Sequence, residues 1–169
     1  MAISDYLRSV RAKVGHDLLV LPSAAAVVRD DRGRVLFGLH ADKKIWVVPG
    51  GLVEPGELPA DAAVRETWEE TGLLIELTGL LGVVGGPDLV IHYDNGDVAS
   101  YVGTIFRARA VGGELEADGS ETLDVRYMSR TELEKVEHSA WIHAALDLIF
   151  ARSGEHAFQP ATWKPPARP

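Results

Sequence analysis

The most constraining feature of this 169-residue chain is a predicted helix with an acidic face. Pro59 suits the first turn of a helix, because its missing N–H would have no partner there, and Gly72 suits a left-handed stop. Between them, Glu66, Glu69 and Glu70 stand at i, i+3 and i+4, so the three carboxylates share one face. Like charges this close destabilise an isolated helix and raise each other's pKa values. The pattern therefore predicts a helix that needs a compensating charge.

Two interpretations of this acidic face are open. Short glutamate runs are usually solvated surface. The opposite side of the helix, however, carries apolar residues that we expect to face the core, among them Ala62, Trp68 and Leu73. Arg65, whose i+4 partner is Glu69, leaves the face under-compensated. A divalent cation would offset the repulsion, and oxygen ligands without a nearby Cys or His favour Mg²⁺ or Mn²⁺ over zinc.

A glycine-rich loop precedes the helix. Gly50 and Gly51 follow the apolar run Trp46–Val48, and paired glycines let a backbone approach a ligand closely. The same glycines would also serve in an ordinary tight turn between a strand and a helix. Glu57, at the end of the loop, is close enough to pair with Arg65 and hold the loop. We expect Glu57 to orient the metal ligands without binding the metal itself.

Together the loop and the helix resemble the signature of the Nudix hydrolases, Gly-x5-Glu-x7-Arg-Glu-(apolar)-x-Glu-Glu-x-Gly-(apolar). The segment Gly51–Leu73 fills all seven specified glycine and charged positions. At residue frequencies of roughly 0.07, seven chance matches have odds on the order of 10⁻⁸ at one starting point. Thr67 is the one departure, because the signature has an apolar residue there. Its methyl group can still face a core while its hydroxyl bonds back along the helix.

The resemblance implies an α/β fold, a Nudix-type α/β/α sandwich with a central mixed β-sheet in a single domain. It implies a Mg²⁺-dependent pyrophosphohydrolase, with Mn²⁺ able to substitute, in which water attacks one phosphorus of a nucleoside diphosphate linked to another moiety. ADP-ribose or another nucleotide sugar, a nucleoside triphosphate and a dinucleoside polyphosphate are all open as substrates. The alternative is a catalytically silent Nudix-fold module that binds a nucleotide for regulation. Such a module would be expected to lose signature carboxylates, and none is lost here.

The signature also implies roles for individual residues. Glu66, Glu69 and Glu70 match the family's metal-binding carboxylates, and Arg65 matches the arginine that orients them. The carbonyl of Gly50 matches a further metal ligand. Which carboxylate deprotonates the water varies among family members, so the general base stays open.

A further acidic residue often lies in the loop before the last sheet strand of this family, as a metal ligand or a base. Glu121 fits that position best, because it lies six residues before Tyr127 and leads into a predicted strand. Asp118 or Glu116 could take this role instead, and a solvated loop acid is the plain alternative. We therefore count Glu121 among the catalytic and metal-binding candidates.

Candidates for substrate contacts are His40, Trp46 and Tyr101. His40 stands where many Nudix enzymes place an arginine that contacts substrate, although a lone His at a strand end is more often structural. An aromatic face can stack on any base, but aromatic residues in strands more often belong to the core. Pro87 lies fourteen residues after Leu73, slightly short of the spacing of the proline that marks ADP-ribose pyrophosphatases, and Gly-Pro is also typical of a plain turn.

Composition disfavours several classes of partner and excludes some kinds of chemistry. The net charge of −8 disfavours non-specific binding to nucleic acid or to an anionic membrane surface. The chain has no cysteine, which excludes disulfide, zinc-thiolate and thiol-nucleophile chemistry. It shows neither a secretory h-region nor an apolar run of membrane-spanning length. We expect a cytoplasmic protein whose partner is a nucleotide-type small molecule, and relatives in this family are frequently homodimers.

The remaining sequence predicts elements that alternate around one sheet. We expect a Nudix domain over residues 1–152, with an amphipathic helix at 3–15, and a proline-rich C-terminal tail at 153–169. Phe158 and Trp163 either pin this tail against the domain or leave it a disordered end. The expected strands are 18–29 and 34–39, paired as a hairpin, then 46–48, 74–84, 89–93, 99–110 and 123–128, and the later helices are 130–135, capped by Ser129, and 139–152.

Overall fold

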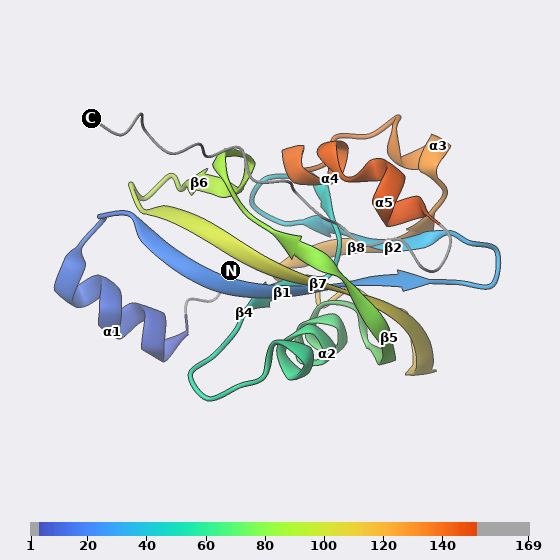
Figure 1. Cartoon of the computed structure of the whole chain (residues 1–169), viewed down its shortest axis with the longest axis horizontal. Helices are drawn as coiled ribbons and strands as arrows, with labels where there is room; N and C mark the ends of the chain where they lie inside the picture. The colour runs from blue at the N-terminus through green and yellow to red at the C-terminus, as the bar shows by residue number, and fades with distance from the viewer. Residues whose placement is uncertain (1–3, 152–169) are drawn as a thin grey trace, which may run out of the picture.

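The computed structural model describes residues 4–151, and the expected tail at 153–169, with Phe158 and Trp163, lies outside them. In chain order the elements are α1 (Asp5–Val14), β1 (Leu19–Arg29), β2 (Val35–His40), β3 (Trp46–Val47), β4 (Gly50–Leu52), α2 (Pro59–Thr71), β5 (Leu73–Val84), the 3₁₀ turn η1 (Pro87–Leu89), β6 (Val90–His92), β7 (Val98–Gly113), β8 (Thr122–Met128), α3 (Arg130–Leu133), α4 (Ala140–Ala144) and α5 (Leu146–Phe150). Figure 1 shows a twisted sheet with α2 on one face and the C-terminal helices on the other.

The strands form one mixed sheet, whose main path runs β3-β2-β1-β7-β5. β1 and β7 pair in parallel, whereas β5 and β7 are antiparallel. The short strand β4 pairs antiparallel with the middle of β1, where Gly51 lies opposite Ala24 and Gly50 opposite Ala25. β8 pairs with β2, which brings the loop before β8 to the same region. The predicted α/β/α sandwich with a mixed sheet is confirmed.

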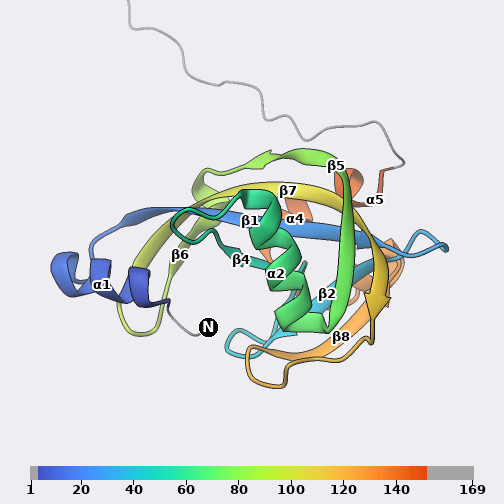
Figure 2. The same ribbon diagram turned by 90° about the horizontal axis from the view of Figure 1, so that it is seen from below.

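Small side chains set the distance between α2 and the sheet. Ala62 and Ala63 of α2 are fully buried and belong to the same apolar cluster as Ala24 and Ala26 of β1. Alanine on both sides lets a helix approach a strand closely, so α2 lies directly over β1 and beside β4, as Figure 2 shows. The opposite face of the sheet is covered by larger residues of α3, α4 and α5, including Ile142.

Two predictions about α2 have opposite outcomes. The side chain of Thr67 is fully buried, and its hydroxyl donates to the carbonyl of Ala63 at 2.7 Å, as expected for a threonine in an apolar position. The prediction that Trp68 faces the core is wrong, because Trp68 is 51% exposed. The buried stripe of the helix follows positions 63, 67 and 71, and Trp68 lies one residue, about 100° of rotation, away from it.

The other predicted elements are close to those observed, except that the glycines of the predicted loop belong to the short strand β4, the expected strand 89–93 is shortened to β6, and the last helix is broken. The capping box of α3 is present: the side chain of Ser129 accepts the N–H of Glu132, whose carboxylate accepts the N–H of Ser129 at 2.8 Å. Gly72 ends α2 in the left-handed conformation, with φ at 69°. The single helix expected at 139–152 is wrong, because Ala145 interrupts it with φ −108° and ψ 10°. Alanine favours helices most strongly, so no local signal predicts this break.

Between residues 4 and 151, no helix is both long and apolar enough to cross a membrane.

The burial of Thr67 predicts the effect of two substitutions. Thr67→Val keeps the buried methyl group and removes the hydroxyl, while the carbonyl of Ala63 keeps its helical N–H partner. We expect the free energy of unfolding to stay within about 0.5 kcal/mol of the parent value. Thr67→Ser removes the methyl group and should lose about 1 kcal/mol. Urea denaturation measures both, and a larger loss for valine than for serine would contradict the packing described.

Candidate active site

An acidic pocket of about 260 Å³ lies between β4, the polar face of α2 and the loop before β8. Six carboxylates and one guanidinium line it: Glu54, Glu66, Glu69, Glu70, Asp118, Glu121 and Arg65. The three segments that supply them are held together by the sheet. In particular, the N–H of Ala41, next to the end of β2, donates to the carbonyl of Glu121 at 2.8 Å. The pocket thus concentrates negative charge at one place on the molecule.

Arg65 joins the glycine loop to α2. Its guanidinium donates two hydrogen bonds to Glu57, at 2.8 Å and 3.0 Å, which confirms the predicted pair. It also donates to the carbonyl of Leu52 at 3.1 Å. Glu57 in turn accepts the backbone N–H of Glu54 at 3.0 Å. The hydrogen bonds from Arg65 lower the pKa of the Glu57 carboxyl, so Glu57 is ionised wherever the pair is formed.

Arg65 also faces the acidic pocket. It donates to Glu66 at 2.8 Å and to Glu69 at 3.1 Å. The Glu66 carboxylate lies against the backbone of Gly51, where an added Cβ would come within 2.5 Å of it. A residue with a Cβ at position 51 would occupy the space of the Glu66 carboxylate, which explains why the signature segment begins with a glycine.

Glu70 reaches the other glycine of the loop. The N–H of Gly50 donates to the Glu70 carboxylate at 3.3 Å. A Cβ at Gly50 would lie 2.4 Å from the carbonyl oxygen of Ala24, so a larger residue would push β4 off β1. The glycine pair therefore lets the loop touch the sheet on one side and the helix carboxylates on the other.

The electrostatics of the pocket favour a bound cation. Burial is the main cause that raises the pKa of Glu66, with the charges of Glu69 and Glu121 adding to it and Arg65 opposing it. Burial also raises the pKa of Glu70 well above its usual range, and the charges of Glu66 and Glu121 act in the same direction. The single guanidinium of Arg65 cannot neutralise the six carboxylates that line the pocket. If all six are ionised, a further positive charge is needed to stabilise them.

The donor set fits a hard divalent cation, because it consists of carboxylate oxygens and nearby carbonyls. Among residues 4–151, however, no group of three His, Asp or Glu side chains is already gathered closely enough to hold an ion. Arg65 instead engages Glu66 and Glu69. A cation here would compete with the guanidinium for those two carboxylates.

The loop before β8 brings Glu121 to the pocket, together with one of its two alternatives. Asp118 also lines the pocket, but its carboxylate accepts the backbone N–H groups of Glu121 at 3.0 Å and Thr122 at 2.7 Å and so shapes its own loop. Glu116 is absent from the lining, and its N–H donates to the carbonyl of Thr71 at 3.0 Å.

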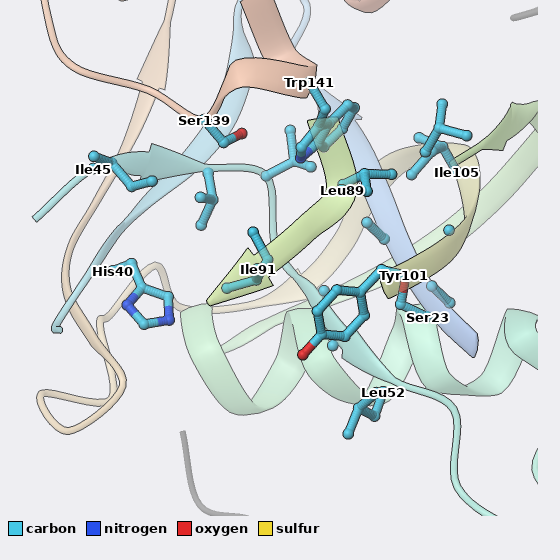
Figure 3. Close-up of a pocket in the computed structure, with 18 of the residues that line it drawn as sticks. Ser23, His40, Ile45, Leu52, Leu89, Ile91, Tyr101, Ile105, Ser139 and Trp141 are labelled. Atoms are coloured by element: carbon cyan, nitrogen blue, oxygen red, sulfur yellow. The ribbon is translucent and has the colours of Figure 1, made fainter. Parts of the chain in front are cut away.

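A second pocket, of about 190 Å³ and mostly apolar walls, adjoins the acidic one. Gly51 and Leu52 line both pockets, so β4 stands between them. Figure 3 shows Tyr101 and Leu52 on one side of this apolar pocket, and Ser139 with Trp141 at the opposite end. The sequence did not single out Ser139 or Trp141, because they come from a segment far from the signature and carry no motif.

The three candidate substrate contacts are placed differently. Tyr101 lines the apolar pocket, its hydroxyl lies 2.5 Å from that of Tyr93, and burial raises its pKa. His40 lines it too, accepts the N–H of Asp42 at 3.2 Å, and has its pKa lowered by burial. Trp46 lines neither pocket: it is 7% exposed and packs in the core, so the structure gives no support to a substrate contact there.

Comparison with known proteins identifies the family. Residues 20–147 match the NUDIX domain model. Over 126 residues the chain is 36% identical to a MutT-like protein of Streptomyces ambofaciens, a match that covers 75% of this chain and 74% of that protein. It is 38% identical to an ADP-ribose pyrophosphatase of Methanocaldococcus jannaschii, over 56% of this chain and only about half, 52%, of that protein.

Solved structures agree with the fold. A NUDIX hydrolase from Nitrosomonas europaea superposes with a TM-score of 0.65 at 23% identity, covering 82% of this chain and 76% of that one. A UDP-X diphosphatase superposes with a TM-score of 0.63 at 17% identity, covering 89% of this chain and 70% of that one. Since the family model spans the glycine loop, the acidic helix and the loop before β8, this chain belongs to the Nudix hydrolases, enzymes that act on diphosphate bonds, as the segment Gly51–Leu73 predicted.

Proposed function

We propose that this chain is a Mg²⁺-dependent pyrophosphohydrolase, with Mn²⁺ able to substitute, which cleaves the diphosphate of a nucleoside diphosphate derivative by attack of water on phosphorus. The observation that carries the proposal is the meeting of Glu66, Glu69, Glu70 and Glu121 in one pocket. A solvated acidic face would leave these carboxylates in water, whereas burial here raises the pKa values of two of them. Two half-buried carboxylates beside the exposed Glu69 and the loop residue Glu121 support cation binding.

The residues of the pocket divide the work. Glu66, Glu69, Glu70 and Glu121, with the carbonyl of Gly50, would hold the divalent cation. Bound there, it would neutralise charge on the diphosphate oxygens and lower the pKa of a water molecule. The pocket carboxylates would supply the base that takes the proton of that water.

Two residues position these groups. Arg65 donates to Glu66 and Glu69 and so fixes the orientation of their carboxylates on α2. Glu57 accepts two hydrogen bonds from Arg65 and so fixes its guanidinium. This supports a role for Glu57 in orienting the metal ligands through Arg65. A regulatory module without activity would have no need for the complete set, so the hydrolase is favoured.

The adjoining apolar pocket supports a substrate that carries a nucleoside. A diphosphate at the acidic pocket would lie beside Gly51 and Leu52, which border both pockets. An attached ring could then enter the apolar pocket lined by Tyr101. Relatives named for ADP-ribose and for UDP-linked compounds fit this class, and nucleotide sugars, nucleoside triphosphates and dinucleoside polyphosphates are the substrates to be compared.

The proposal predicts the loss of activity in two variants. Glu69→Gln and Glu70→Gln each keep the side-chain shape and remove a negative charge that the cation needs. We expect Mg²⁺-dependent hydrolysis of a nucleotide panel to fall by about 10²-fold or more, with the circular dichroism spectrum unchanged. Chromatographic identification of both products also reports which phosphorus is attacked.

Glu76→Gln is the matched control, because Glu76 lies exposed on β5, paired with Arg109 and outside the acidic pocket. It should keep parental activity. Parental activity in both Glu69→Gln and Glu70→Gln would refute the site.

The raised pKa values of Glu66 and Glu70 predict how Mg²⁺ affects stability. A carboxyl whose pKa rises on folding stabilises the fold fully below its unfolded pKa of about 4.3, and this contribution is lost as pH rises through the folded pKa. In EDTA, these two groups should therefore lower the free energy of unfolding as pH rises. Because a cation binds the ionised carboxylates, Mg²⁺ should raise Tm more at about pH 8 than at about pH 5.

Differential scanning calorimetry with Mg²⁺ or EDTA measures this difference. Glu70→Gln, which cannot ionise, should show a smaller increase in Tm with Mg²⁺ at the higher pH. An equal increase in Tm at both pH values in the parent would contradict the assignment of these carboxylates as cation ligands.

A further inference from the structure

The apolar pocket contains a polar group that the fold does not use. Ser139 lines this pocket just before α4. Its hydroxyl oxygen is buried and has no hydrogen-bond partner among residues 4–151. Buried hydroxyls are nearly always paired, because an unpaired one has lost water without gaining a partner. The fold itself therefore gives no reason for a hydroxyl at this position.

Comparison with the other helix-capping serines strengthens this point. Ser4 and Ser129 precede α1 and α3, and each side chain accepts a backbone N–H from the first turn of its helix. Ser139 holds the same position before α4, with an extended backbone, yet its side chain makes no capping bond. Its hydroxyl is thus free to bond a group that enters the pocket.

The surroundings indicate what kind of group that is. The walls beside Ser139 are mostly apolar and include Leu89, Ile91 and Trp141, and Figure 3 shows these side chains around the same space. An apolar pocket with few polar groups accepts a flat, largely apolar ring and orients it through its polar edge. A hydroxyl can donate to a ring carbonyl or ring nitrogen, or accept from a ring amino group.

We propose that Ser139 determines base specificity: its hydroxyl hydrogen-bonds the polar edge of a nucleobase in the apolar pocket, while the attached diphosphate lies in the acidic pocket. This inference rests on the proposed function for the position of the diphosphate. A nucleobase is favoured over a purely apolar ring because such a ring would leave the Ser139 hydroxyl unpaired.

Binding of nucleoside monophosphates tests this role without any hydrolysis. Isothermal titration of the parent with AMP, GMP, CMP and UMP gives a ranking of the four bases. In Ser139→Ala we expect the tightest of the four to weaken by about three- to tenfold, and the ranking to flatten. The thermal stability of this variant should not fall, because the side chain makes no capping bond.

Ser129→Ala is the matched control, because it removes a serine that does cap its helix. It should lose stability and keep the parental ranking of bases. An unchanged ranking in Ser139→Ala, an equal loss for all four nucleotides, or no binding of any of them to the parent would each overturn the proposal.

The hydrolysis assay separates this inference from the proposed function. Activity that requires Glu70 but shows the same base preference in Ser139→Ala overturns the role of Ser139 alone. Base-selective binding that depends on Ser139, in a parent without hydrolytic activity, overturns the proposed function and supports the role of Ser139 in base recognition.

Discussion

The ion pair between Arg65 and Glu57 is the contact on which the rest of the site depends. Two parallel hydrogen bonds fix the guanidinium plane, which then has donors left for Leu52 on one side and Glu66 on the other. Because a single planar cation bridges the loop and the helix, neither can move without the other. The carboxylates of α2 consequently keep a defined position over β4 although they repel each other.

Close packing gives this ion pair its setting. Small residues face each other where α2 crosses β1, so the helix backbone lies near the sheet. The glycines of β4 then meet the helix carboxylates without intervening side chains, Gly51 at Glu66 and Gly50 at Glu70. A Cβ at Gly50 would meet the backbone of β1, and a Cβ at Gly51 would displace the Glu66 carboxylate, so larger residues here would disturb the contacts between β4 and α2. The positions of the Glu66 and Glu70 carboxylates therefore depend on the small residues that let α2 approach β1 and β4.

Features encoded within a short stretch of sequence could be predicted, and features that depend on tertiary contact could not. The Glu57–Arg65 pair, the stop at Gly72 and the burial of Thr67 follow from spacing and backbone chemistry, and the structure has all three. The exposure of Trp68 does not follow from its hydrophobicity, because its rotation around the helix places it beside the buried stripe. The burial of Trp46 does not follow from the sequence either, because an aromatic residue in a strand can face either side of a sheet.

The role of Ser139 could not be foreseen for a different reason. Its segment carries no motif, and only the folded chain shows that its hydroxyl is buried and unused. The break at Ala145 is equally hidden, since alanine is the best helix former. Glu121 could be predicted in part. Its position before an expected strand made it a candidate, but only the pairing of β8 with β2 shows that it reaches the acidic pocket.

The brevity of β4 has a consequence for how this protein can vary. Its three residues all pair with β1, and two of them, Gly51 and Leu52, border both pockets, so one short strand serves chemistry and recognition together. A shift of one residue in its register would turn Leu52 toward the position of Gly51 and exchange the two sides of the strand. Insertions within β4 should therefore be eliminated by selection, and so should length changes in the loop after it, which carries Glu57 to Arg65.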